Sequence, residues 1–287
     1  MSERFTGLEP VEELNRVCKA MADSNWKYLC IETKSGERWH GGNQHWWFRH
    51  VIDKPSREDA KKWSVIFSHA KSDEAFRLTF LGCGVISMVD LELYCCMFHP
   101  EFQMHIGREI SFADGIISQE LYEGIVEARW KKDYHIDRNS FNLHVGLYPW
   151  RMEKGIAGFL RQNKYGVQKV KWAPYLRYGN AVQKRHLLAA IKEMLNKNLP
   201  VVCAYHTFDP KHRKLTLYRN PESAKRKLEA TKQDAVIDSH YMTIIGLFRD
   251  ENEKLYLQIV SWGIIYYTGF DEFSESLNLF TNILLIS

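Results

Sequence analysis

The chain has 287 residues, of which 45% are hydrophobic and 26% are charged, a composition typical of a soluble globular protein with one large domain or two lobes. The formal net charge of +4 is too small to favour nucleic acid as a partner. No apolar run is long enough for a membrane span, and the first residues contain no apolar signal segment, so we expect a cytoplasmic protein.

The cysteines are scattered and show no C-x-x-C spacing, which argues against a zinc ribbon and against a dense disulfide framework. Scattered cysteines in a chain with no visible export segment favour a reducing compartment. We expect no metal and no cofactor. The six residues are Cys18, Cys30, Cys83, Cys95, Cys96 and Cys203. The last three lie in apolar runs and are assigned to packing.

Residues 1–75 are expected to pack on or extend the main core. Apolar residues at steps of three and four predict a helix over 9–22, and a second helix is expected near 56–68. A strand is expected at 26–33. The Gly-Gly-Asn turn at 41–43 lies within a cluster of tryptophans, which the sequence places neither in the cleft nor behind it.

The spacing of apolar residues changes in the next segment. Residues 76–81 alternate apolar and polar side chains, which indicates a strand or an extended approach. From Cys83 the period becomes helical, and His99-Pro100 ends the helix. The residues that mark this helical face are Ile86, Val89, Leu93 and Met97.

Further helices are expected in the middle of the chain, at 117–128, 153–162 and 181–198, where apolar side chains recur with helical spacing. The basic and aromatic stretch at 164–177 is expected to be a loop or an edge strand. A short buried strand follows the last helix at 201–205.

The end of the chain is rich in expected strands. It is preceded by a basic segment, 211–232, which is either a solvated insertion between two strands or a surface for an anionic partner. Helices therefore come first and strands last, which indicates the α+β class rather than a repeating βαβ pattern. The expected strands are 241–248, 255–260, 264–268 and 281–286.

Cys83 stands where the extended pattern gives way to the helical one. Free N–H groups and the helix dipole lower the pKa of a thiol at a helix start, so Cys83 is a candidate nucleophile. The flanking Gly82 and Gly84 let a substrate approach the backbone, and the Cys83 N–H is a candidate oxyanion donor. The alternative is an ordinary buried cysteine.

The glycine turn around Cys83 also resembles the nucleotide-binding turn of methyltransferases. That motif needs a third glycine for close packing of helix on strand. Ile86 and Ser87 occupy those places here, and the downstream region does not alternate strands with helices. This alternative is therefore the weaker one.

His240 begins the apolar run 240–246, 157 residues after Cys83. A histidine at the start of a buried strand can turn one ring nitrogen toward a thiol and act as its base; an ordinary core or loop histidine is the alternative. Ser261-Trp262-Gly263 follows. Ser261 is the nearest polar candidate to orient the ring, and Trp262 is a candidate shield against water.

With these residues in place, the chain resembles papain-like cysteine peptidases, and among them the bacterial C39-like group. Residues 83–88 look like that group's Cys-Gly-x-x-Ser-hydrophobic helix start. Residues 240–246 look like its His-Tyr-hydrophobic-Gly strand. The strand entry at 198–202 and the closing hairpin at 257–263 fit in order and spacing. The resemblance covers about 76–287.

The resemblance implies a helical lobe at about 76–198 that carries the cysteine, packed on an antiparallel β lobe at about 199–287 that carries the histidine, with the site between them. Residues 1–75 lie outside it. The family has an Asn where this chain has Val260, and an oxyanion-stabilising Gln where this chain has Arg77. Arg77 is therefore a candidate oxyanion stabiliser or a surface charge.

These features predict a thiol-dependent hydrolase, peptidase- or amidase-like, in which Cys83 and His240 form a thioester with a peptide or another amide or ester substrate. Two alternatives stay open. One is an acyltransferase on the same fold. The other is a papain-like binding module that has lost catalysis, which the residues at 77 and 260 favour. No membrane partner is expected, and the sequence leaves the oligomeric state open.

Overall fold

The computed structural model describes most of the chain beyond residue 27. The helix expected at 9–22 lies outside the described part, as does the helix expected near 56–68 apart from Ser56 itself. The described residues are 28–52, 56, 73–99, 101–105, 109–110, 115–134, 147–166, 170–174, 181–206, 214–227, 230–231, 234–237, 239–250, 252–276 and 282–286.

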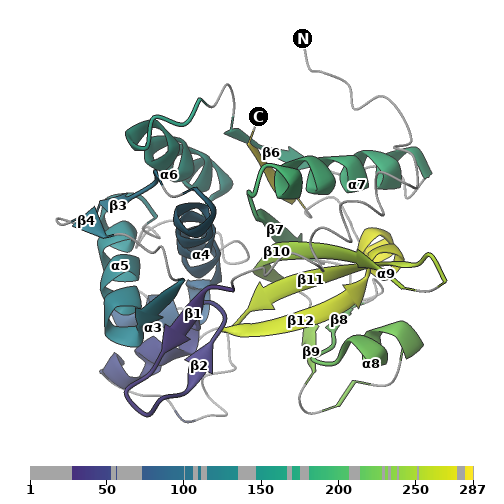
Figure 1. The fold of residues 1–287 in the computed structure, drawn as a ribbon. Helices are drawn as coiled ribbons and strands as arrows, with labels where there is room; N and C mark the ends of the chain where they lie inside the picture. The colour runs from purple at the N-terminus through teal and green to yellow at the C-terminus, as the bar shows by residue number, and fades with distance from the viewer. Residues whose placement is uncertain are drawn as a thin grey trace.

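The centre of the helical part is α4, which is buried along nearly its whole length. It packs against three other helices and against strand β10 of the large sheet (Figure 1). A helix whose side chains are mainly apolar all round needs such an enclosed place. The helix predicted from Cys83 to His99-Pro100 is confirmed. The four helices are α3 (Glu74–Leu81), α4 (Cys83–Phe98), α5 (Gln119–Lys132) and α6 (Pro149–Gln162).

The extended structure expected at 76–81 is wrong, because this segment is helical. Asp73 caps α3: its Oδ1 accepts a hydrogen bond from the Phe76 N–H at 3.0 Å. Residues 76–79 are all buried, so α3 is enclosed on several sides. The alternation of apolar residues therefore does not mark the two faces of a strand.

Among the described helices, none is by itself long and apolar enough to cross a membrane. Only α3 and α4 taken together reach that length and composition, and these two are bent by 77° at the break between them.

Residues 28–52 join the helical part. Strand β1 pairs with β2 antiparallel and with β5 in parallel, which confirms the described end of the strand expected at 26–33. The 3-10 helix η1 (Gln44–His50) packs on α3. The short strands of this part are β1 (Cys30–Glu32), β2 (Arg38–Trp39) and β5 (Ile116–Ser118), with a separate pair, β3 (Met104–His105) and β4 (Glu109–Ile110).

A six-stranded antiparallel sheet packs beside the helices, in the order β12-β11-β10-β7-β13-β6. Central strand β10 is buried for most of its length and contacts both α4 and α7. The elements of this part are β6 (Val170–Pro174), α7 (Ala181–Asn196), β7 (Val201–His206), β10 (Ser239–Arg249), β11 (Leu255–Ser261), β12 (Ile264–Gly269), α9 (Phe270–Ser276) and β13 (Asn282–Ile286).

The large sheet includes elements that precede residue 198, where the helical lobe was expected to end. Strand β6 is the edge strand next to β13, and α7 packs on β7, β10 and β13. Both were expected in the helical lobe, which in the structure ends with α6. The protein is therefore a mixed α+β fold, with a helical N-terminal part packed on an antiparallel sheet.

The basic segment 211–232 lies between β7 and β10 in the chain. Strand β8 (Leu215–Leu217) pairs with β9 (Ala235–Ile237), and α8 (Pro221–Arg226) lies between them. A bridge between Tyr218 and Tyr267 ties the unit to β12 at the edge of the large sheet. This matches the predicted insertion between two strands.

Candidate active site

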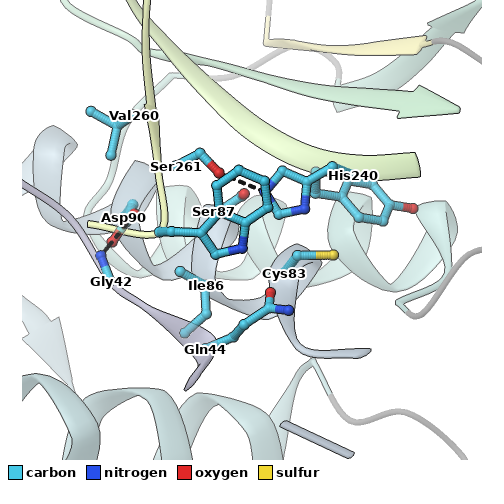
Figure 2. A pocket seen from close by; sticks show the side chains of 11 residues that line it. Gly42, Gln44, Cys83, Ile86, Ser87, Asp90, His240, Val260 and Ser261 are labelled. Carbon is cyan, nitrogen blue, oxygen red and sulfur yellow. Dashed lines mark hydrogen bonds between the residues drawn. The ribbon is translucent and has the colours of Figure 1, made fainter. Parts of the chain in front are cut away.

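Cys83 is the first residue of α4, directly after the bend that follows α3. Gly82 makes this bend possible, because a Cβ there would lie 2.1 Å from the Leu78 carbonyl oxygen. Gly84 is also confined, with a Cβ position 2.9 Å from Leu147 Cβ. Cys83 is half-buried and lines a pocket between α4 and the sheet (Figure 2). The two glycines serve close packing, and neither lines that pocket.

His240 lies in β10 and lines the same pocket, so the fold brings the two candidate residues together. Its Nε2 is 2.5 Å from the Oγ of Ser261 on neighbouring strand β11. The other ring nitrogen, Nδ1, is on the side of the ring that faces Cys83 (Figure 2). In the tautomer with the proton on Nε2, the ring donates to Ser261 and keeps a lone pair on Nδ1 for the thiol proton.

Trp262 covers one face of the His240 imidazole, with ring centroids 4.1 Å apart and planes inclined by 14°. Trp262 and Gly263 form the two-residue turn between β11 and β12, and both have positive φ, 49° and 75°. Such a turn favours Asn or Gly, and a bulky residue in the left-handed region costs about 1–2 kcal/mol. The stacking contact with His240 offsets that cost and fits the shielding role expected for Trp262.

Burial controls the protonation of both residues. It lowers the pKa of His240 to about 3, so the imidazole is neutral at neutral pH. It also raises the pKa of Cys83, and hydrogen bonds from the backbone N–H groups of Tyr241 and Gly84 oppose this only in part. The expectation of a lowered Cys83 pKa is therefore wrong, because loss of water outweighs the helix start. The pair rests as thiol and neutral imidazole.

Gln44 lines the pocket as well, although its distance from Cys83 in the sequence left it without an assigned role. It is the first residue of η1, is buried, and turns its amide toward Cys83 (Figure 2). A carboxamide N–H beside a nucleophilic sulfur is the kind of donor that stabilises an oxyanion. The signal in the sequence was the turn at 41–43, followed by a polar amide among tryptophans.

The segment that carries Gln44 is tied to both halves of the fold. The N–H of His40 donates to the carbonyl of Gly263 in the β11–β12 turn at 2.8 Å. The N–H of Gly42 donates to Asp90 on α4 at 3.0 Å. The segment before Gln44 is therefore anchored on each side of the pocket.

Arg77 is neither at the pocket nor on the surface, which corrects both alternatives for it, the oxyanion stabiliser and the surface charge. Its side chain is buried in α3 and does not line the site. Because α3 is helical and bent by 77° from α4, residues a few positions before Cys83 do not run alongside it as an extended strand would. Val260 does line the pocket, and its neighbour Ser261 makes the polar contact.

Three of the other cysteines serve packing. Five free thiols lie in the described part of the chain, and Cys95, Cys96 and Cys203 are buried, which confirms their assignment. In the described part of the chain, no group of three or more His, Cys, Asp or Glu side chains is placed to hold a metal ion.

The fold and the pocket define a mixed α+β protein with a cysteine and a histidine facing one small cavity. Comparisons of the chain with models of protein families, with curated proteins and with solved structures find no match. The function is therefore inferred from the pocket itself.

Proposed function

We propose that the protein is a thiol-dependent hydrolase that acts on an amide or ester carbonyl. The observation that carries this proposal is that one pocket holds the Cys83 thiol, the His240 imidazole with its bond to Ser261, and the Gln44 amide. A nucleophile, a base, an orienting group and an oxyanion donor are the parts that acyl transfer needs. A papain-like relationship is part of the proposal, since such enzymes pair a helix-start cysteine with a strand histidine.

The chemistry proceeds through a thioester. The Cys83 Sγ attacks the carbonyl carbon while the Nδ1 of His240 takes the thiol proton. The Gln44 side-chain N–H and the Cys83 backbone N–H stabilise the resulting oxyanion. When the oxyanion collapses, the bond to the leaving group breaks and the imidazolium gives its proton to the leaving nitrogen or oxygen. Water then attacks the thioester with His240 as base, which releases the acid and restores the thiol.

The resting protonation favours a second candidate, a binding module on the same fold that has lost catalysis. Burial raises the pKa of Cys83 and lowers that of His240 to about 3, so moving the proton from sulfur to imidazole is uphill in the closed pocket. A serine hydroxyl also stabilises an imidazolium less than a carboxylate does. Substrate binding has to supply the difference in the hydrolase.

Burst kinetics with p-nitrophenyl acetate separate these candidates. A hydrolase gives a stoichiometric burst of p-nitrophenolate followed by steady turnover in water. An acyltransferase gives the burst, with turnover only after an amine or thiol acceptor is added. Cys83→Ala abolishes the burst in either case, whereas Cys30→Ala, which removes another half-buried free thiol, leaves it intact. If wild type and Cys83→Ala release p-nitrophenolate with the same time course, the binding module is the candidate that remains.

A further inference from the structure

Asp90 lies two helical turns after Cys83 and on the same face of α4. Spacings of four and three residues place Cys83, Ser87 and Asp90 one above another, and all three line the pocket. Asp90 is only 2% exposed. A carboxyl group so deeply buried is costly unless its oxygens are hydrogen-bonded, so its partners indicate what it does.

The partners of Asp90 are the Gly42 backbone and the Tyr122 hydroxyl. The N–H of Gly42 lies 3.0 Å from Oδ1 and 3.2 Å from Oδ2, and the Tyr122 O–H donates to Oδ1 at 2.7 Å. Asp90 therefore connects α4 with α5 through Tyr122. It also connects α4 with the chain two residues before Gln44, a contact drawn in Figure 2.

The backbone at Gly41 and Gly42 is shaped for this contact. A Cβ on Gly41 would lie 2.7 Å from the Oδ2 of Asp90 and 2.5 Å from the Cγ1 of Val260. A Cβ on Gly42 would lie 1.9 Å from the hydroxyl oxygen of Tyr122. Any side chain at either position would push the segment away from the carboxyl group.

We propose that Asp90 is a positioning residue, which accepts the Gly42 N–H and thereby holds the Gln44 amide beside Cys83. This inference rests on the proposed function, because the amide matters only if Cys83 forms an oxyanion. It gives a role to an acidic residue on the buried face of the nucleophile's own helix, where an apolar side chain would otherwise pack at less cost.

The test compares two reactions of Cys83, of which only one forms an oxyanion. p-Nitrophenyl acetate acylates the thiol through a tetrahedral oxyanion, whereas iodoacetamide alkylates it by direct displacement. Asp90→Leu removes both acceptors, and we expect acylation to slow roughly ten- to a hundredfold. Alkylation, which needs no oxyanion donor, changes by no more than about twofold. Asp90→Asn keeps one oxygen for the Gly42 N–H and recovers most of the lost acylation rate.

Gln44→Ala completes a double-mutant cycle. If Asp90 acts through Gln44, Asp90→Leu costs little further acylation rate when Gln44 is already alanine. Equal losses in both backgrounds, or equal losses of acylation and alkylation, overturn the positioning role and leave the hydrolase standing. Absence of Cys83-dependent acylation in the wild type removes the hydrolase, and the positioning role with it.

Hydrogen exchange tests the contact without any activity. The amides of residues 42–44 exchange faster in Asp90→Leu while those of α4 stay protected. Unchanged exchange at 42–44 overturns the proposal. If Asp90→Leu fails to fold, Tyr122→Phe removes only the Tyr122 bond to Asp90, and a smaller loss of acylation relative to alkylation is expected. An unchanged ratio in that variant overturns the proposal.

Discussion

The imidazole of His240 lies flat against the indole of Trp262, with ring centroids 4.1 Å apart. Trp262 holds a left-handed backbone, φ 49°, which Asn or Gly adopts at less cost. Trp262 suits this turn poorly but stacks closely on His240. We infer that the indole occupies this position because it covers the imidazole. In the proposed mechanism, the indole keeps water from the base that receives the proton of the Cys83 thiol.

Replacing Trp262 by Asn keeps the turn and removes the cover. We expect the pKa of His240 to rise from about 3 toward its ordinary value of 6.5, because water reaches the ring and stabilises the imidazolium. The measurement is an NMR titration of the ring Cε1–H. Trp262→Phe, which keeps an aromatic cover, raises the pKa less. Identical titrations in all three proteins would mean that Trp262 does not desolvate the ring.

Ser261→Ala removes the partner of the His240 Nε2. The ring then samples the wrong tautomer and orientation, and we expect acylation of Cys83 to slow roughly tenfold or more. The matched control is Ser274→Ala, a buried serine of α9 whose Oγ donates to the Asp271 carbonyl at 3.0 Å. Burst rates give the comparison, and ¹⁵N shifts of the imidazole report the tautomer. Equal rates in the two variants would remove the orienting role of Ser261.

Two buried groups in the pocket titrate in opposite senses. The folded pKa of Asp90 is raised to about 7 by burial, so its contribution to stability falls as pH rises from about 4 to about 7. The folded pKa of His240 is lowered to about 3, so its contribution falls as pH drops from about 6.5 to about 3. Between about pH 4 and 6.5 the two contributions oppose each other.

Asp90→Asn removes the first of these contributions. We expect its free energy of unfolding to fall on acidification from pH 6.5 to 4, relative to wild type, by about 1.4 kcal/mol per pH unit. His240→Gln gives the opposite relative slope over the same interval. Urea unfolding at several pH values measures both differences. Curves parallel to that of the wild type would show that neither group titrates as its burial requires.

Glu92 tests stability on the same helix but away from the pocket. Its carboxylate is fully buried and accepts a hydrogen bond from the Nε of Arg129 at 2.8 Å. Glu92→Gln removes one of two carboxylates that pair with the guanidinium, the other being Asp133 at 2.6 Å, and we expect a loss of about 3 kcal/mol in the free energy of unfolding. The ratio of acylation to alkylation at Cys83 stays unchanged. A shift in that ratio would mean that any damage to α4 imitates loss of Asp90.

Local patterns predicted the elements whose environment is simple. The helical period after Cys83 and the apolar run from His240 correspond to α4 and β10. The contact between His240 and Ser261 was also predictable, because two neighbouring strands bring their side chains together. The segment 76–81 was misread because alternation over so few residues does not separate a strand from an enclosed helix. Asp73, a cap before Phe76, was the overlooked signal.

Gln44, the proposed oxyanion donor, could not be assigned from the sequence for a different reason. Tertiary contacts bring the segment of Gln44 to the pocket, among them the Gly42–Asp90 hydrogen bond, and no spacing in the sequence encodes them. The raised pKa of Cys83 was likewise invisible, because it depends on how much water the folded pocket excludes.

The most direct test of the Cys83–His240 pair is mass spectrometry after brief exposure to p-nitrophenyl acetate, with peptide mapping of the modified residue. We expect a single acetyl group on Cys83 in the wild-type protein. In His240→Ala, acetylation of Cys83 falls to the level seen in a urea-unfolded sample. Equal acetylation of Cys83 with and without His240, or acetylation confined to other residues, would contradict the proposed pair.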